Sequence, residues 1–215
     1  MIRIVLSIIL VFSALKNASA NEIFEGVIEY KVEVESFTEK LPVELLKEGY
    51  GSDVEAYYKP GYEKIVLNNA QGVQRAWEIY VASENKKYSM ITSDIMPTTF
   101  DGGEEARKLK SFSDKDSDLK ILGKKTRLIT VEYADGTISN YWYSPSIFID
   151  PVQFKNLKFA YLNRYWKIAR SPYLKHERHH GEYKIIYSAV KVRPEKLDDR
   201  IFSVWRSTIN SWIQI

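Results

Sequence analysis

Alternating apolar and charged residues mark the clearest strand in the chain. From Ile28 to Glu35 apolar and charged side chains alternate. One face of the segment therefore carries Ile28, Tyr30, Val32 and Val34. This two-residue period predicts a half-buried antiparallel strand. The charged residues between them must face water, because burying four charges in a row would cost more free energy than the strand could return.

Turn residues between apolar runs predict three hairpins. Proline presets φ for a turn, glycine tolerates positive φ, and Asp-Gly is the strongest short hairpin signal. The predicted strand pairs and their turns are 54–59 and 64–67 around Pro60-Gly61, 77–82 and 87–92 around Ser83-Glu84-Asn85, and 126–133 and 137–143 around Asp135-Gly136. Further strands are expected over 182–192 and 201–204, which makes the chain mainly β.

Other segments depart from this strand pattern. Residues 41–47 fit either a short helix or a loop. Residues 93–118 contain Pro97, Gly102-Gly103 and mixed charges without a sustained apolar period, which predicts a long loop with one helical turn.

The best helix signal follows Asp150-Pro151, an N-cap residue and a proline suited to the first helical turn. We predict a helix over 151–166 that ends before Ser171-Pro172. Apolar residues recur after its start with helical spacing, namely Phe154, Leu157, Tyr161, Leu162 and Tyr165.

The start of the chain has the pattern of an export signal. Arg3 precedes an apolar run over 4–15, and Ala18-Ser19-Ala20 offers the small residues that a signal peptidase needs. Twelve apolar residues rise only about 18 Å as a helix, well short of the roughly 30 Å hydrocarbon core of a membrane. We therefore expect a signal peptide over 1–20 and a single exported domain over 21–215, periplasmic or alternatively secreted, without an integral membrane segment.

Composition narrows the chemistry that this domain can perform. The chain has no cysteine, which excludes disulfides, thiolate zinc sites, iron–sulfur clusters and cysteine nucleophiles. With 31 Lys and Arg against 28 Asp and Glu, the formal charge of +3 is too small and dispersed to predict nucleic-acid binding. No glycine-rich phosphate loop or nucleophile elbow occurs, so we expect no cofactor, no metal and no catalytic residue.

One motif does match a metalloprotease signature. His176-Glu177-Arg178-His179-His180 satisfies H-E-x-x-H, in which Glu177 would act as the base. That chemistry needs both outer histidines on one helical turn, about 6 Å apart, whereas a strand separates them by about 13 Å. Because the segment lacks an apolar stripe and runs into a strand, we favour a solvated strand end or turn, and a zinc peptidase is only the third hypothesis.

Several segments resemble the DUF4412 and GLPGLI families of exported bacterial proteins. The matching elements are Phe24 to Tyr30, Ile121-Leu122-Gly123-Lys124-Lys125, Tyr141 to Ile147, Pro172 with Leu174, and Phe202. Thr126 stands where these families often have cysteine and the GLPGLI string itself is absent, so the choice between the two families stays open. Both resemble the LolA/LolB and LppX group of lipid and lipoprotein carriers. The resemblance implies an incomplete antiparallel β-barrel with helices packed on its concave face, and it carries over no catalytic residue.

These observations lead to a hypothesis of sequestration without chemistry. A lipid or the acyl chain of a lipoprotein would bind between the sheet and the helix, where the residues expected to line the cavity are Trp142, Phe154, Leu157, Tyr161 and Trp166. If helix side chains fill that space instead, the same fold becomes a protein–protein interaction module of the cell envelope.

Overall fold

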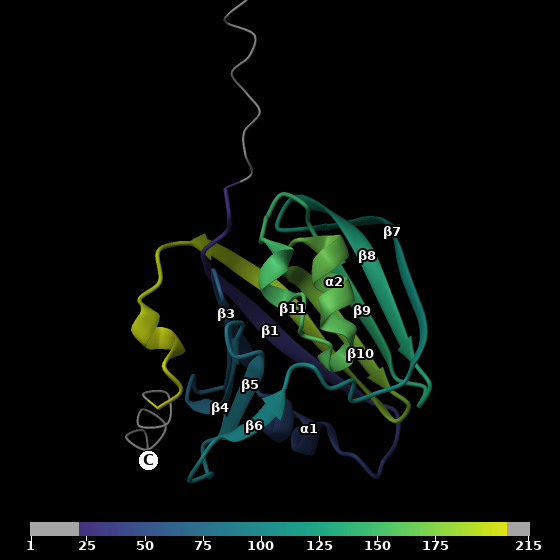
Figure 1. The fold of residues 1–215 in the computed structure, drawn as a ribbon. Helices are drawn as coiled ribbons and strands as arrows, with labels where there is room; N and C mark the ends of the chain where they lie inside the picture. The colour runs from purple at the N-terminus through teal and green to yellow at the C-terminus, as the bar shows by residue number, and fades with distance from the viewer. Residues whose placement is uncertain (1–21, 206–215) are drawn as a thin grey trace, which may run out of the picture.

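Eleven strands form one antiparallel sheet in the computed structural model, which describes residues 22–205 (Figure 1). Their order is β6-β5-β4-β3-β2-β1-β11-β10-β9-β8-β7. The strands are β1 (Gly26–Ser36), β2 (Asp53–Lys59), β3 (Tyr62–Asn68), β4 (Gln74–Val81), β5 (Lys86–Ile91), β6 (Thr98–Asp101), β7 (Leu109–Ile121), β8 (Lys124–Tyr133), β9 (Ile138–Tyr143), β10 (Tyr173–His180) and β11 (Tyr183–Pro194). The curved sheet leaves β6 and β7 as separate edges, which confirms the predicted incomplete antiparallel barrel.

Strand β1 lies at the centre of the sheet between β2 and β11. Its alternation is as predicted: Ile28, Tyr30 and Val34 are buried, while Lys31 and Glu33 are exposed. The apolar set faces the concave side, where Ile28 and Tyr30 belong to the largest buried cluster of the described residues.

A broken helical segment, here called the cover (residues 151–169), packs on the concave face near the upper ends of β8 to β11 in Figure 1. It consists of η1 (Pro151–Phe154), η2 (Phe159–Tyr161) and α2 (Leu162–Ala169). The prediction of one continuous helix over 151–166 is wrong, because Ala160 and Tyr161 have φ of 51° and 59°, outside the helical region. Asp150 still caps the first turn by accepting a hydrogen bond from Val152 N at 3.0 Å.

A second helix covers the opposite end of the concave face. Helix α1 (Val43–Tyr50) confirms the helical alternative for this segment, and its Leu46 packs with Val34 and Ile185. Val34 and Ile185 are register partners in β1 and β11, so α1 and the cover lie on the same side of the sheet. The two helical elements leave a stretch of concave face between them.

The convex face of the β1–β5 half is covered by the chain that follows β11. Leu197 and Phe202 pack on Val27 there, and the short helix η3 (Asp199–Phe202) ends this contact. The strand expected over 201–204 is therefore wrong.

Strands β6 and β7 replace much of the long loop expected over 93–118. Most residues of both strands are exposed and none is buried, because the strands form the two edges of the sheet and pair on one side only. Their sequences consequently lack the apolar alternation on which the prediction depended. Residues 102–108, here called the connection, cross the mouth of the half-barrel between them and contact the cover through Lys158 N, which donates to Gly102 O at 2.6 Å (Figure 1).

Candidate functional site

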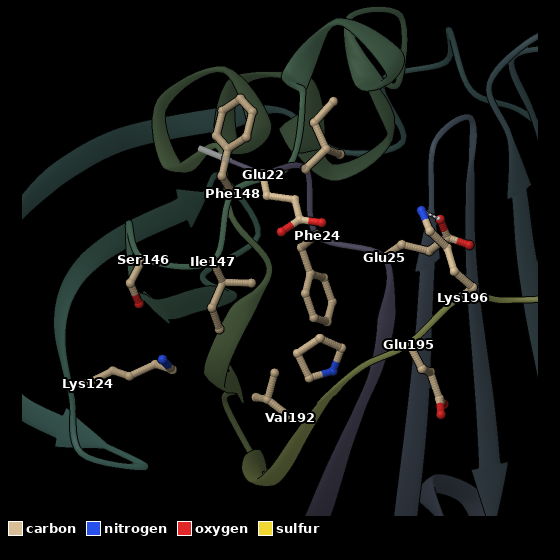
Figure 2. Close-up of a pocket in the computed structure, with 12 residues that line it drawn as sticks. Glu22, Phe24, Glu25, Lys124, Ser146, Ile147, Phe148, Val192, Glu195 and Lys196 are labelled. Atoms are coloured by element: carbon tan, nitrogen blue, oxygen red, sulfur yellow. Dashed lines mark hydrogen bonds and ion pairs between the residues drawn. The ribbon is translucent and has the colours of Figure 1, made fainter. Parts of the chain in front are cut away.

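A pocket of about 420 Å³ opens at the upper end of the half-barrel. Four separate segments form it: the chain entering β1, the end of β11, the loop between β9 and η1, and the first residue of β8 (Figure 2). Backbone pairing fixes two of these segments together, because Phe24 N donates to Phe148 O at 2.7 Å. The volume lies within the range of roughly 300–1,000 Å³ that is typical of small-molecule sites.

The interior wall of this pocket is apolar and continuous with the protein core. Phe24, Ile147 and Val192 line the pocket and also pack in or against the concave cluster. The ring of Phe24 lies 6.3 Å from that of Tyr58, and Tyr58 lies 6.1 Å from Trp166 in the cover. A ligand in the pocket would therefore touch the same aromatic cluster that holds the cover in place.

Charged groups surround this apolar wall. Glu22, Glu195 and Lys124 reach the pocket from three sides (Figure 2). The Glu25 carboxylate accepts hydrogen bonds from Leu197 N at 2.8 Å and Lys196 Nζ at 3.0 Å. The backbone hydrogen bond of Leu197 is the main cause that lowers the pKa of Glu25, so this carboxylate is a fixed negative charge. An apolar wall with a charged rim suits a molecule that is apolar at one end and polar at the other.

Four of the five residues that the sequence proposed as cavity lining do meet on the concave face. Phe154, Leu157, Tyr161 and Trp166 are between 0 and 8% exposed and share the main buried cluster. They fill the space between sheet and cover, since Phe154 stacks on Trp166 and on Tyr80 with ring centroids 4.1 and 5.7 Å away. Their contact with a ligand stays a prediction, and it requires the cover to move.

Trp142, the fifth residue expected to line the cavity, does not face the space between the sheet and the cover. In β9 the buried residues Ser139, Tyr141 and Tyr143 face the concave side, so Trp142 faces the convex side. There Lys175 Nζ lies 5.1 Å from the centre of its ring. The sequence pointed to Trp142 because it is aromatic, whereas the two-residue period of the strand decides its face.

The H-E-x-x-H segment forms most of β10, an interior strand between β9 and β11. His176 and His180 therefore cannot share a helical turn. The segment does end a strand, as expected, but its residues are partly buried and not fully solvated. His176 stacks between Tyr141 and Tyr187, with ring centroids 4.3 and 5.7 Å away. Burial is the main cause that lowers the pKa of His176 to about 3. Residues 22–205 contain no group of three metal-binding side chains.

Sequence reasoning did not identify Phe24, Lys124 or Val192 as site residues. They come from distant segments, and only the topology brings them together. Phe24, Lys124 and Ile147 did carry a signal, because each lies in an element on which the family resemblance depends, whereas Val192 carried none.

Comparison with known proteins gives distant structural similarities only. No family model matches the chain, and no curated protein does. A solved structure of a LolA superfamily protein from Nitrosomonas europaea is similar, with a TM-score of 0.38 and 6% identity over 85% of this chain and 91% of that one. A likeness this distant does not assign the chain to a family. Over the part of the chain that the structure describes, no helix has the length and apolar character of a membrane span.

Proposed function

We propose that this protein is an exported binding protein that holds the apolar part of a lipid or acyl chain without chemically changing it. The observation that carries the proposal is the pocket of about 420 Å³, whose apolar wall is made of core side chains while its rim is charged. Burial of apolar surface contributes about 25 cal/mol per Å², so the methylene groups of a chain in this pocket would supply the affinity.

A ligand longer than the pocket would need further space, which movement of the cover would provide. One polar atom at the cover's contact with the sheet, Trp166 Nε1, is buried without a hydrogen-bond partner, whereas the Tyr58 hydroxyl is within hydrogen-bonding reach of Tyr30 and Glu63. An unpaired buried group of this kind costs free energy, which opposes the packed arrangement of the cover. Outward movement of α2 would expose the aromatic concave face to a chain that enters past Phe24.

The first test is whether the mature protein carries a ligand. We would purify residues 21–215 from an exporting host and compare native with denaturing mass spectra. A stoichiometric adduct that disappears on denaturation supports binding and identifies the ligand class. A bare mass, together with no saturable binding of a fluorescent long-chain fatty acid, would contradict the proposal.

A pair of variants locates the binding site. Ser146 is exposed and lines the pocket, so Ser146→Trp fills it from the rim without changing the core. We expect about tenfold weaker fatty-acid binding, a loss of roughly 1.4 kcal/mol. Ser113→Trp places the same large side chain on the exposed edge strand β7, and its affinity should match that of the wild type. Equal affinities for all three proteins would place the ligand elsewhere.

A protein–protein interaction module is the second candidate function. It is favoured by edge strand β6, whose four residues are all exposed and include Phe100, and by the exposed apolar residues Ile95 and Met96 just before it. An unpaired apolar edge can add a strand from another protein. A photo-crosslinking residue in place of Phe100 should then capture one specific envelope protein in the exporting host, whereas the same residue in place of Phe37 should not.

A further inference from the structure

Unpaired polar atoms concentrate on the concave face between the cover and α1. Within residues 22–205, eight buried side-chain nitrogen or oxygen atoms have no hydrogen-bond partner, and five of them come from this one region. The five atoms are Arg107 Nη1, Ser139 Oγ, His176 Nε2, Arg178 Nε and His180 Nε2. Arg107 Nη1 has an ion-pair contact with Asp135, and Ser139 is within hydrogen-bonding reach of Tyr133 and Tyr141, so the two histidine nitrogens and Arg178 Nε carry the argument. Buried polar groups are almost always hydrogen-bonded, so these atoms would gain hydrogen bonds from a polar ligand placed among them. We call these five residues the basic cluster.

Strand pairing brings the sheet residues of the basic cluster together. Ser139 in β9 is the direct register partner of Arg178 in β10. His176 and His180 lie two residues to either side of Arg178, so all three side chains point to the same face of the sheet. The stacking of His176 on Tyr141 identifies that face as the concave one.

Arg107 reaches the same region from the end of the connection, which lies beside the β8–β9 turn, since Ala134 N donates to Lys108 O at 2.9 Å. Its guanidinium lies 5.4 Å from the centre of the Tyr133 ring, and its Nη1 lies 3.5 Å from the Asp135 carboxylate. Burial is the main cause that lowers the pKa of His180 to about 4, and the charges of Arg178 and Arg107 lower it further while Asp135 opposes them. Both guanidinium groups therefore act on one histidine.

The positive charge of the basic cluster is incompletely neutralised. Asp135 pairs with Arg107, but no carboxylate of the described residues forms an ion pair with Arg178. The other titratable groups near Arg178 are the phenols of Tyr50, Tyr133, Tyr141 and Tyr187, and burial raises the pKa of each, so they stay neutral. A partly buried guanidinium without a counter-charge is costly, and an anion would relieve that cost.

We propose that the basic cluster binds a phosphate group, either as free phosphate or as the headgroup of a lipid. A guanidinium fork donates two parallel hydrogen bonds to phosphate oxygens, and Arg107 and Arg178 bring two such forks from different elements to the surroundings of His180. The Ser139 hydroxyl and the ring N–H groups of the two histidines supply further donors. Because donors arrive from two strands and from the connection, a tetrahedral anion fits them better than a planar carboxylate.

This site is separate from the apolar pocket. Val192 in the pocket is near the end of β11, whereas His180 pairs with Tyr183 at the start of the same strand. The phosphate site therefore does not depend on the function proposed for the pocket, and either proposal can fail alone.

The test is an NMR titration of the mature wild-type protein with inorganic phosphate at constant ionic strength, set with chloride. We expect saturable shifts of the ring resonances of His176 and His180, and a raised pKa for both rings, because a bound anion favours the imidazolium form. His179 faces the opposite side of β10 and is the internal control. The absence of a saturable shift up to about 20 mM phosphate, well above millimolar affinity, would overturn the proposal.

Matched variants assign the effect to the cluster. Arg178→Gln should weaken phosphate binding at least about tenfold. Lys175→Gln removes the same charge from the same strand, but Lys175 faces the convex side at Trp142, so its binding should stay unchanged. If Arg178→Gln does not fold, Arg107→Gln replaces it, since Arg107 lies on the connection outside the strands. Equal weakening in the Lys175 variant would mean a diffuse charge effect and would overturn the site.

The source of the phosphate is distinguished by a second probe, a single-chain alkyl phosphate below its micelle concentration. Tighter binding than inorganic phosphate, by about tenfold and with the same dependence on Arg178, supports a lipid headgroup. Equal or weaker binding supports free phosphate. Binding of the alkyl phosphate that is indifferent to Arg178→Gln and sensitive to Ser146→Trp would confirm the apolar pocket and overturn the phosphate site.

Discussion

The indole ring of Trp166 stacks on the phenyl ring of Phe154, with centroids 4.1 Å apart and planes 13° from parallel. The two residues lie on either side of the break at Ala160 and Tyr161, one in α2 and the other in η1. Their stacking joins the two ends of the cover, and Tyr58 of the sheet makes a T-shaped contact with the indole, with ring centroids 6.1 Å apart. The cover therefore depends on this pair for its attachment.

Replacement of Trp166 by alanine tests this dependence. Trp166 is 2% exposed, so Trp166→Ala should lower the free energy of unfolding by about 3–5 kcal/mol, measured by urea denaturation. Trp142→Ala is the matched control, because this half-buried indole lies on the convex face, and it should cost less than about 2 kcal/mol. Equal losses for both variants would show that packing in the cover contributes no more to the free energy of unfolding than a half-buried side chain on the convex face does.

A buried carboxylate in β3 predicts a loss of stability as pH rises. Glu63 lies opposite Tyr80, and burial is the main cause that raises its pKa from 4.5 to about 7, with Lys87 opposing and Glu78 adding to the rise. Between pH 4.5 and 7 the native state holds a proton that the unfolded chain has lost, so stability declines across this window. Glu63→Gln should therefore be more stable than the wild type at pH 8, by about 1–3 kcal/mol, and similar to it at pH 4.

The control for this carboxylate is Glu33→Gln, an exposed position on the convex face of β1. Its stability difference from the wild type should not change between pH 4 and pH 8. Chemical denaturation of the three proteins at both pH values measures the effect. A Glu63→Gln curve parallel to the wild-type curve would contradict the burial of this charge.

The sequence alone predicts the strands in which buried and exposed residues alternate. Strand β1 and the hairpins at Pro60-Gly61 and Asp135-Gly136 were recognised because one face of each strand is apolar and glycine occupies the turn, with φ of 89° at Gly61 and 84° at Gly136. These signals are local, and together they predict a mainly β chain of antiparallel hairpins, whereas the open barrel was implied by the family resemblance.

Elements whose conformation depends on distant neighbours were missed. Strand β7 has charged residues on both faces because it is a solvated edge, a feature that also discourages pairing with other molecules. The cover shows helical spacing of apolar residues, yet Tyr161 Oη accepts a hydrogen bond from Leu109 N at 3.0 Å and its own backbone is left-handed. The spacing of apolar residues along the chain does not predict contacts between the cover and a segment some fifty residues earlier.

Acid should destabilise the protein through His176. Its pKa is lowered to about 3, mainly by burial, whereas the unfolded chain protonates near 6.5. As pH falls below 6.5 the unfolded state gains a proton that the native state does not accept, so stability is lost progressively down to about pH 3. His176→Gln should show a weaker loss of the urea midpoint between pH 7 and pH 4.5 than the wild type. His179→Gln, on the convex face of the same strand, should keep the full wild-type loss, and identical pH profiles for the two variants would refute the assignment to His176.

The turn between β7 and β8 offers a stabilising substitution. Leu122 and Gly123 both have positive φ, 49° and 73°, as in a type I′ hairpin turn, and Leu122 is 45% exposed. A leucine in this left-handed region costs about 1–2 kcal/mol, whereas asparagine adopts it readily and loses little packing here. Leu122→Asn should therefore raise the free energy of unfolding by about 0.5–1.5 kcal/mol.

Leu119→Asn provides the comparison for this turn, because Leu119 lies in the same hairpin and is 40% exposed, but its φ is not positive. The same substitution there removes apolar surface without relieving strain, so it should be neutral or destabilising. Thermal and urea unfolding of both variants separate the effect of backbone conformation from that of the side chain. A stabilisation shared by both positions would mean that the loss of an exposed leucine, and not the relief of the left-handed turn, is responsible.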